Sequence, residues 1–326
     1  MKYRKLGRTG VEVSEIGFGA WAIGGSWGSQ QDADSLAALN RALDMGVSII
    51  DTAAGYGDGR SERIIGQVLR ERNDRDRVTV TTKAPPAPGP WPPSPYCLWQ
   101  DRYSERYLRE NVEERLKYLD SDHLDVLLLH TWTRAWNRDP QPLHILKRLQ
   151  QEGKIRFIGI STPEHDQNAL IEPMKQGLLD VVEVIYNIFE QEPAAELLPA
   201  AAANSVGVIA RMPFDESALT GKLKAQTRFE EGDFRNNYFM GDRLARTVNE
   251  VEKVRQDLQD SAYTLPQAAL KFVLAHPAVS TTIPGMRNTA QVEANLSVSD
   301  MEPISPQLQQ KLRAHNWRRA FWYEGR

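Results

Sequence analysis

Short apolar runs recur along the chain with room for a helix between most of them, and this rhythm limits the fold more than any other feature. After an opening that looks like a small β-hairpin with a turn over Gly7–Gly10, eight such runs are candidate strands: 16–19, 47–50, 78–82, 124–129, 155–160, 181–185, 206–210 and 279–283. Strands joined by crossover helices pair in parallel, and eight such units close naturally into a barrel. We therefore predict an α/β fold, a (β/α)8 TIM barrel with an N-terminal β-hairpin.

Segments of helical period lie between these runs, over 33–45, 61–71, 105–119, 142–152, 166–175 and 195–203. Gly46 and Gly153 follow two of them and suit the left-handed conformation that often ends a helix. No shift in composition marks a domain boundary, so residues 1–326 are expected to form one barrel domain. Barrels of this kind carry their sites at the C-terminal ends of the strands, so the site residues should follow the apolar runs.

Two insertions interrupt the rhythm and predict long loops at that face. Seven prolines between residues 85 and 95 exclude both a helix and a central strand. Because they fall between the third strand and the third helix, we expect this loop to line the site. The interval from Arg211 to Pro284 is too long for a single crossover, with helices predicted over 242–260 and 266–275. We expect the polar, aromatic stretch 214–238 before them to form a flap over the site.

Composition excludes several classes of partner. The chain has 40 basic and 43 acidic residues and a net charge of −3, which does not favour binding to nucleic acid. Its apolar runs are far shorter than the roughly 20 residues of a membrane helix, and its start, Met-Lys-Tyr-Arg-Lys, does not read as a signal peptide. We therefore expect a cytoplasmic protein without a membrane partner. The single cysteine, Cys97, cannot form an internal disulfide and is expected to be a chance loop thiol.

Polar side chains stand where three of the apolar runs stop, and a fourth follows in a loop. Asp51 ends Ile-Ile-Asp, Lys83 ends Val-Thr-Thr-Lys, His130 ends Leu-Leu-Leu-His, and Tyr56 lies in the loop after Asp51. Each alone has an ordinary explanation: a helix cap, a solvated lysine, a wall histidine and a packing tyrosine. Together on one barrel face, however, they form a coherent acid device.

The device donates a proton to oxygen. A tyrosine hydroxyl has a pKa near 10 in water, and an adjacent ammonium lowers that pKa by stabilising the phenolate. Lys83 would supply the charge, Asp51 would hold Lys83 protonated, and His130 would hydrogen-bond a substrate carbonyl beside Tyr56. The histidines show no metal-ligand spacing, so no metal is expected. A hydride from a nicotinamide is the electron-pair donor that fits a proton delivered to oxygen.

These residues, together with motifs elsewhere in the chain, match the pattern of a known family. The motifs that carry the resemblance are Leu6-Gly7-Arg8-Thr9-Gly10, Asp51-Thr52-Ala53 with Tyr56-Gly57, Lys83, His130 and Ile283-Pro284-Gly285-Met286-Arg287-Asn288. Over about residues 3–296 the chain resembles the aldo-keto reductases. The resemblance implies that Asp51, Tyr56, Lys83 and His130 are the catalytic residues, with Tyr56 as general acid or base. It also implies NADP(H) as cofactor and the reversible reduction of an aldehyde or ketone to an alcohol.

The resemblance also implies where the cofactor lies. The carboxamide would meet Ser161, Thr162 in place of the usual Asn, and Glu183 in place of the usual Gln, while Arg211 would replace the aromatic residue that commonly stacks on the nicotinamide. A segment with Pro213, Phe214, Leu219, Gly221 and Lys222 would cover the pyrophosphate. The adenosine 2′-phosphate and adenine would bind at a helix N-terminus, at Gly285, Arg287, Gln291 and Asn295. NADH stays an alternative to NADPH, because Gly285 stands where Lys is commoner.

Another cofactor motif and a set of aromatic residues need weighing. The run Gly17-Phe-Gly19-Ala-Trp-Ala22 matches a dinucleotide-binding pattern, but the sequence after it cannot open a good helix, so a Rossmann fold is not expected. Trp21, Trp91 and Trp132 fall at the same face and would line a wide substrate pocket for a flat or sugar-like molecule, although each could be a packing residue instead. The segment from Trp317 to Tyr323 could close over it.

Three functions remain open from the sequence. The leading hypothesis is the NADPH-dependent carbonyl reductase. The resemblance extends to potassium-channel β-subunits, so a regulatory subunit that binds NADPH and serves as an interaction partner is the alternative. A barrel isomerase or epimerase with a different acid and base is the third, and it predicts no nicotinamide binding. The expected partner is a small carbonyl or alcohol substrate, and the sequence predicts neither its identity nor an oligomeric state.

Overall fold

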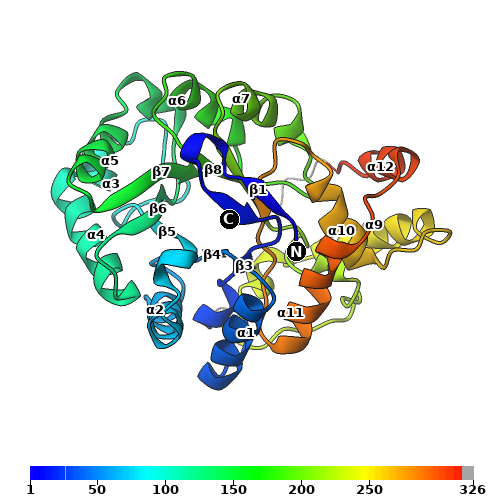
Figure 1. Cartoon of the computed structure of the whole chain (residues 1–326). Helices are drawn as coiled ribbons and strands as arrows, with labels where there is room; N and C mark the ends of the chain where they lie inside the picture. The colour runs from blue at the N-terminus through cyan, green and yellow to red at the C-terminus, as the bar shows by residue number, and fades with distance from the viewer. Residues whose placement is uncertain (26, 318–326) are drawn as a thin grey trace.

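The computed structural model describes residues 1–25 and 27–317 and consists of a ring of helices around a central sheet (Figure 1). The sheet has eight strands, in the order of the chain: β3 (Phe18–Gly19), β4 (Ile49–Asp51), β5 (Thr79–Ala84), β6 (Leu124–Leu129), β7 (Ile155–Ser161), β8 (Val181–Ile185), β9 (Gly207–Arg211) and β10 (Thr281–Thr282). All neighbouring strands pair in parallel. The predicted (β/α)8 barrel is confirmed.

Glycines close the barrel between its first and last strands. Parallel bridges join Ile16 to Thr282 and Gly19 to Gly285, and the Gly19 amide donates to the carbonyl of Pro284 at 3.0 Å. A Cβ at Gly19 would lie 2.5 Å from the carbonyl oxygen of Ile283, so only glycine permits this approach. The Gly-x-Gly pattern at residues 17–19 therefore serves barrel closure, and the rejection of a Rossmann fold is correct.

The hairpin at the N-terminus stops one end of the barrel. Strands β1 (Tyr3–Lys5) and β2 (Glu12–Ser14) pair antiparallel, and the hairpin crosses the centre of the ring of helices in Figure 1. Its buried Leu6 and Val13 pack with six residues of the barrel interior: Ile49, Val126, Leu128, Val181, Ile209 and Ile283. The predicted hairpin is present, and two of its apolar side chains complete the bottom of the core.

The helices follow the predicted order. They are α1 (Asp32–Asp44), α2 (Arg60–Arg72), α3 (Trp99–Tyr103), α4 (Glu105–Leu119), α5 (Gln141–Gln151), α6 (Ile171–Lys175), α7 (Leu197–Ala203), α8 (Arg235–Tyr238), α9 (Arg243–Asp257), α10 (Leu265–Leu274), α11 (Thr289–Leu296) and α12 (Pro306–Arg313). Gly46 and Gly153 are left-handed, as predicted, with φ of 88° and 80°. None of the helices in the described residues is long and apolar enough to cross a membrane.

Two helices are shorter than predicted, for the same reason. The segments predicted over 166–175 and 195–203 begin instead at Ile171 and Leu197, each preceded by a 3-10 turn. Pro173 and Pro199 then lie within the first turn of their helices, where a missing N–H costs nothing. The longer predicted helices would have placed both prolines in a helix interior.

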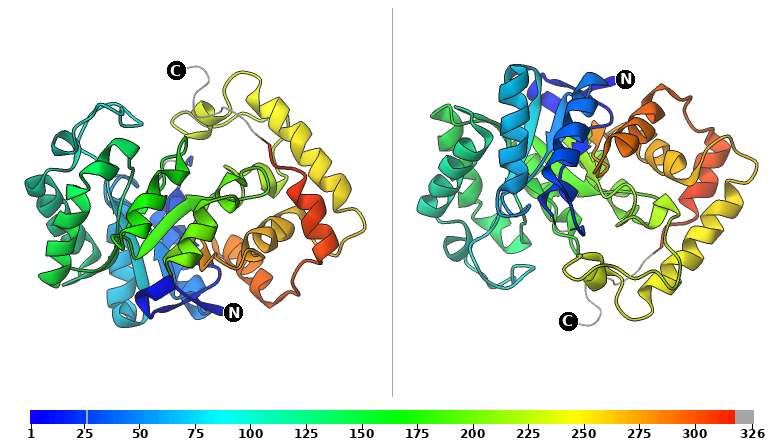
Figure 2. Two further views of the ribbon diagram at one scale, coloured as in Figure 1. Left: turned by 90° about the horizontal axis from the view of Figure 1, so that it is seen from above. Right: turned by 90° about the horizontal axis from the view of Figure 1, so that it is seen from below.

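Both insertions lie where the sequence predicted loops. Residues 85–95 form neither helix nor strand, but the short helix α3 just after them was not predicted. The stretch 214–238 holds one 3-10 turn, Ala218–Thr220, and α8. Beyond it, α9 lies against α12 at one edge of the molecule, as both views in Figure 2 show.

Candidate active site

Alternation along the strands places the functional side chains in one layer. Ile49, Leu128, Val181 and Ile209 point into the barrel interior, and successive side chains of a strand point to opposite faces. The residues two positions further along therefore also point inward, one layer nearer the C-terminal ends: Asp51, His130, Glu183 and Arg211. Lys83 follows the buried Thr81 in the same way.

Lys83 is the centre of this layer. Its buried Nζ donates to both carboxylate oxygens of Asp51, at 2.8 and 2.7 Å, and to the backbone carbonyl of Thr52 at 2.9 Å. The hydroxyl of Tyr56 lies 3.3 Å from the same nitrogen and accepts a hydrogen bond from it. The structure thus brings together three of the four residues that the sequence singled out for acid–base work.

The fourth residue and two tryptophans surround Tyr56. The rings of Tyr56 and His130 have centroids 6.3 Å apart, and Trp21 stacks on Tyr56 at 6.1 Å. Trp91, from the proline-rich loop, meets His130 edge-on at 6.0 Å. Tyr56 and His130 are partly exposed whereas Asp51 and Lys83 are buried. The phenol and the imidazole are therefore the members of the set that a small molecule could reach.

The pKa of Tyr56 is shifted in the direction opposite to the sequence prediction. Lys83 lowers it as expected, but burial of the phenol, together with the charges of Asp51 and Glu183, outweighs the ammonium and raises the pKa above its usual value. The sequence argument counted one charge near Tyr56 and left out desolvation. Burial and the Lys83 charge also lower the pKa of His130 to about 3, so its imidazole is neutral at pH 7.

A second carboxylate contacts Lys83, and the sequence reading missed this contact. Oε2 of the buried Glu183 lies 3.2 Å from Nζ, while its Oε1 accepts from the Ser161 hydroxyl at 3.0 Å. Arg211 lies on the other side, with Nε 3.6 Å from Glu183 and Nη2 3.4 Å from Glu164. The sequence did carry a signal for this contact. Glu183 is a charged residue at an inward position of the apolar run Val-Val-Glu-Val-Ile.

Asp51 and Glu183 differ in how readily they ionise. Burial tends to raise the pKa of Glu183, but Lys83 and Arg211 outweigh it and the pKa is lowered. Burial raises the pKa of Asp51 and repulsion by Glu183 adds to the rise, so this pKa lies well above its usual value although Lys83 lowers it. Glu183, and not Asp51 alone, is therefore a counter-ion of the ammonium.

The residues expected to hold a cofactor lie in three groups along the C-terminal face. Ser161, Thr162, Glu183 and Arg211 form the first, at the ends of β7, β8 and β9; Arg211 also donates to the carbonyl of Thr162 at 3.2 Å. The second is the segment after β9, with Pro213, Phe214, Leu219, Gly221 and Lys222, in which Met212, Asp215, Glu216 and Ser217 all have positive φ. Gly285, Arg287, Gln291 and Asn295 form the third, around the start of α11.

Arg287 already has partners in this third group. Its Nε donates to Oε1 of Gln30 at 2.8 Å, and Nη2 donates to the backbone carbonyl of Ser29. Gln30 in turn donates to the carbonyl of Arg287 at 3.0 Å. Glu230, from the predicted flap, accepts from the amide of Ser29 at 3.0 Å, and Phe234 packs on Trp21 with centroids 4.9 Å apart. The flap therefore contacts the loop that follows β3, near the tetrad.

One of the three expected pocket tryptophans lies elsewhere. Trp91 is 42% exposed and Trp21 partly exposed, but Trp132 is fully buried, packs on Trp136 at 5.3 Å and donates from Nε1 to Asn137 at 2.6 Å. A ring without exposed surface cannot line an open pocket, so the prediction for Trp132 is wrong. Trp317 packs on Phe189, and the rest of the expected closing segment, 318–323, lies outside the described residues.

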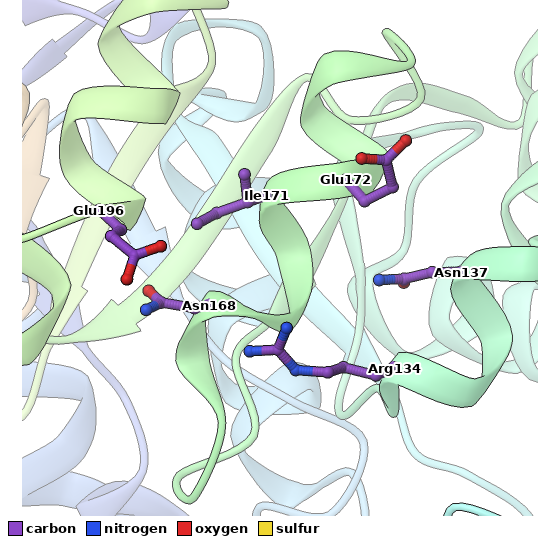
Figure 3. Close-up of a pocket in the computed structure, with 6 residues that line it drawn as sticks. All are labelled: Arg134, Asn137, Asn168, Ile171, Glu172 and Glu196. Atoms are coloured by element: carbon purple, nitrogen blue, oxygen red, sulfur yellow. The ribbon is translucent and has the colours of Figure 1, made fainter.

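A separate polar cavity lies among the segments that follow β6, β7 and β8. Its volume is about 370 Å³, and it is lined by Arg134, Asn137, Asn168, Ile171, Glu172 and Glu196 (Figure 3). Arg134 is held by Asp166 at 2.5 and 2.7 Å. No residue of the tetrad lines the cavity, so it is not the site of the predicted chemistry. No group of His, Cys, Asp and Glu within the described part of the chain could hold a metal ion.

Comparison with known proteins identifies the family. The model of the aldo/keto reductase family matches residues 15–316. The chain belongs to the aldo/keto reductase family. It is 31% identical to the aldo-keto reductase YhdN of Bacillus subtilis over 305 residues, which cover 90% of this chain and 87% of that protein. It is 28% identical to the NADH-specific methylglyoxal reductase of Escherichia coli, covering 91% of this chain and 93% of that protein.

A solved structure and a relative of another kind also match. The holo form of the aldo-keto reductase AKR11C1 from Bacillus halodurans superposes with a TM-score of 0.76 at 26% identity, covering 97% of this chain and 96% of that one. A probable voltage-gated potassium channel subunit beta from Oryza sativa is 29% identical over 96% of both chains. The family and its named oxidoreductases make this chain an enzyme of the aldo-keto reductase type, for which NAD(P)H-dependent oxidoreduction is general.

Proposed function

We propose that this enzyme reduces an aldehyde or ketone to an alcohol with NADPH, reversibly, with Tyr56 as the general acid. The observation that carries the proposal is the contact of the Tyr56 hydroxyl with Lys83 Nζ, at 3.3 Å, on the face where the strands end. A phenol at the solvent-facing side of a buried ammonium is placed to give its proton to an oxygen outside the protein.

The residues of the first cofactor group fit a nicotinamide. Oε2 of the buried Glu183 lies 3.2 Å from the Lys83 ammonium but makes no aligned hydrogen bond, so this carboxylate keeps a lone pair that can accept from a ligand donor. The amide N–H₂ of a carboxamide is such a donor. When bound, the nicotinamide supplies the hydride that adds to the carbonyl carbon.

The chain's own residues would handle the proton and orient the substrate. Tyr56 donates to the carbonyl oxygen, and neutral His130 donates a second hydrogen bond to the same oxygen. Lys83 and Asp51 hold the phenol in position through the hydrogen bonds described above. Trp21 and Trp91, on two sides of Tyr56 and His130, would contact a flat or sugar-like carbonyl compound.

The position of Arg287 supports NADPH as the cofactor, but its hydrogen bonds to other residues compete with a phosphate. A guanidinium at the start of the eight-residue helix α11 suits the 2′-phosphate of the adenosine. However, a phosphate would have to compete with Gln30 and the carbonyl of Ser29 for its N–H groups. NADH therefore remains the second candidate cofactor.

The test is turnover by Tyr56→Phe against a panel of aldehydes and ketones, with NADPH binding measured by fluorescence. The variant should lose roughly 10²- to 10⁴-fold in kcat, the usual contribution of a general acid, and bind NADPH almost as well as the wild type. Unchanged turnover would remove Tyr56 from its role. A wild type that binds NADPH tightly but reduces no carbonyl would favour the regulatory role, and one that binds no nicotinamide would favour an isomerase.

A further inference from the structure

The proline-rich loop that carries Trp91 has few backbone donors of its own. Residues 85–95 include seven prolines, which have no N–H group to donate. The carbonyl groups of this loop therefore either face water or accept from donors elsewhere in the chain. Trp91 is largely exposed yet stands edge-on to His130. Whatever fixes the loop therefore also fixes this indole beside the imidazole.

Arg102 of α3 supplies such donors. It is only 3% exposed. Its Nε donates to the carbonyl of Ala87 at 2.7 Å and its Nη1 to the carbonyl of Pro90 at 2.9 Å, while its own backbone carbonyl accepts from the amide of Ala87 at 2.8 Å. Gly89 lies so close to the guanidinium that a Cβ there would come within 3.1 Å of Nη1. The planar guanidinium thus fixes the path of the loop from Ala87 to Pro90.

The burial of this cation and the shape of the loop depend on each other. Among residues 1–25 and 27–317, no carboxylate pairs with Arg102, so the loop carbonyls are the groups that compensate for its loss of water. A side chain without N–H groups at this position would leave the carbonyls of Ala87 and Pro90 without these donors. The loop would then lose its contact with α3 over the residues just before Trp91.

Helix α3 is itself anchored to the strand ends that carry the site. It contacts α4 and α5, and the fully buried Tyr103 stands next to Arg102 in it. The hydroxyl of Tyr103 donates to the carbonyl of Ala84 at 3.5 Å and accepts from the amide of Thr131 at 3.4 Å. Both backbone groups directly follow a residue of the tetrad. The helix is therefore a fixed base from which Arg102 reaches the loop.

These contacts form a closed set around the site. They lead from the residue after His130 to Tyr103, from the neighbouring Arg102 to residues 87–90, and from Trp91 back to His130. In this set, the side chain of Arg102 supplies the hydrogen bonds that join the loop to the helix. The position of the indole relative to the imidazole thus depends on a residue that contacts neither of them.

We propose that Arg102 is a positioning residue that holds Trp91 beside His130 and thereby makes the site selective for carbonyl compounds with a flat or ring-shaped body. The inference deepens the proposed function and rests on it for its kinetic consequence. A flat substrate gains contact area with the indole only while the indole is held over the site. The smallest aldehydes do not reach the indole, so their turnover should not depend on Arg102.

The direct test needs neither cofactor nor substrate. Protein labelled with 5-fluorotryptophan gives a ¹⁹F signal for each indole, and the Trp91→Phe spectrum identifies the signal of Trp91. Arg102→Met keeps an apolar stem but removes the N–H groups, so this signal should move toward that of 5-fluorotryptophan in unfolded protein, while far-ultraviolet circular dichroism stays unchanged. Arg106→Met is the matched control: the Arg106 side chain is 89% exposed on α4, and its loss should leave the signal in place.

A double-mutant cycle tests the kinetic consequence. Arg102→Met should raise KM for aromatic aldehydes by about tenfold and change KM and kcat for the smallest aldehydes by less than about twofold. In a Trp91→Ala background, Arg102→Met should raise KM no further, because two residues that act through the same contact are not additive. An arginine with a merely structural role would lower kcat for every substrate and would add its effect to that of Trp91→Ala.

A second variant keeps the proposal falsifiable if Arg102→Met does not fold. Arg102→Lys retains the charge but not the planar pair of donors, so it should leave the Trp91 signal between those of the wild type and Arg102→Met. A Trp91 signal unchanged in both Arg102 variants, or additive KM effects in the cycle, overturns the proposal. Full turnover by Tyr56→Phe, with the Trp91 signal displaced in Arg102→Met, would defeat the proposed function and leave the positioning of Trp91 by Arg102 intact.

Discussion

The ring of Trp91 stands edge-on to that of His130, with centroids 6.0 Å apart and planes at 81°. Trp91 belongs to the proline-rich loop and His130 follows β6, so a surface insertion reaches the imidazole proposed to hold the substrate carbonyl. Because of this contact, we expect the loop to take part in substrate choice.

Trp91→Ala should raise KM for aromatic carbonyl substrates by about tenfold or more and change KM for the smallest aldehydes much less, since the lost ring contacts only the larger molecules. Steady-state kinetics over a series of aldehydes of increasing size measures this. Tyr96→Ala is the control, because Tyr96 lies in the same loop but is 93% exposed. Equal effects of the two substitutions would show that Trp91 does not contact substrate.

Trp132→Ala should act on stability. Trp132 is fully buried against Trp136, so its truncation leaves a cavity and should lower the free energy of unfolding by about 3–5 kcal/mol. Chemical denaturation measures the change, and kinetics at a temperature where the variant stays folded should show a KM near that of the wild type. A variant as stable as the wild type with a raised KM would restore Trp132 to the pocket.

Arg287→Ala should weaken NADPH binding by about ten- to hundredfold and NADH binding far less, because a charge-assisted hydrogen bond to the 2′-phosphate is lost in only one of the two complexes. Fluorescence titration with both cofactors tests this. Equal losses would mean that Arg287 does not meet the phosphate.

Gln30→Ala tests the competing contact. It removes the Oε1 acceptor that holds Nε of Arg287 at 2.8 Å, so a guanidinium N–H becomes available to a phosphate. NADPH affinity should rise relative to NADH affinity. A fall in that ratio would indicate that Gln30 orients Arg287 for the phosphate.

Glu216→Gln should change how stability depends on pH. Burial, with repulsion by Asp215, raises the pKa of Glu216 from 4.5 to about 8. Because the pKa of Glu216 is raised in the folded state, the contribution of this group to stability is complete below pH 4.5 and is lost as the pH rises toward 8. The variant lacks this loss, so it should match the wild type near pH 4.5 and exceed it at pH 8 in denaturation experiments. Parallel curves for the two proteins would contradict the expectation.

The layer of the site was predictable because it depends on alternation along strands. Asp51, Lys83 and His130 end apolar runs, and a period of two turns each toward the barrel interior. Glu183 obeys the same rule but stands inside its run, so its contact with Lys83 could be found only by knowing that β5 and β8 face each other across the barrel. Sequence gives the direction of a side chain and not the distance between strands.

Burial was harder to foresee than direction. The pKa of Tyr56 depends on how much water the surrounding loops remove, and Trp132 is buried because loop residues after β6 pack on one another. Neither quantity follows from local pattern, since both depend on loops whose conformations are set by tertiary contacts. The shortened α6 and α7, by contrast, were within reach, because Pro173 and Pro199 alone decide where those helices begin.

Leu6 and Val13 close the N-terminal end of the barrel. One end of the barrel therefore contributes to stability and the other carries the catalytic groups. A substitution in the hairpin should lower the melting temperature and leave the catalytic side chains in place. Among the described residues, the loops at the C-terminal end of the barrel do not contact the hairpin's core residues. Aromatic side chains on these loops can therefore be exchanged without disturbing the fold. A variant of this chain could gain a new substrate by such an exchange.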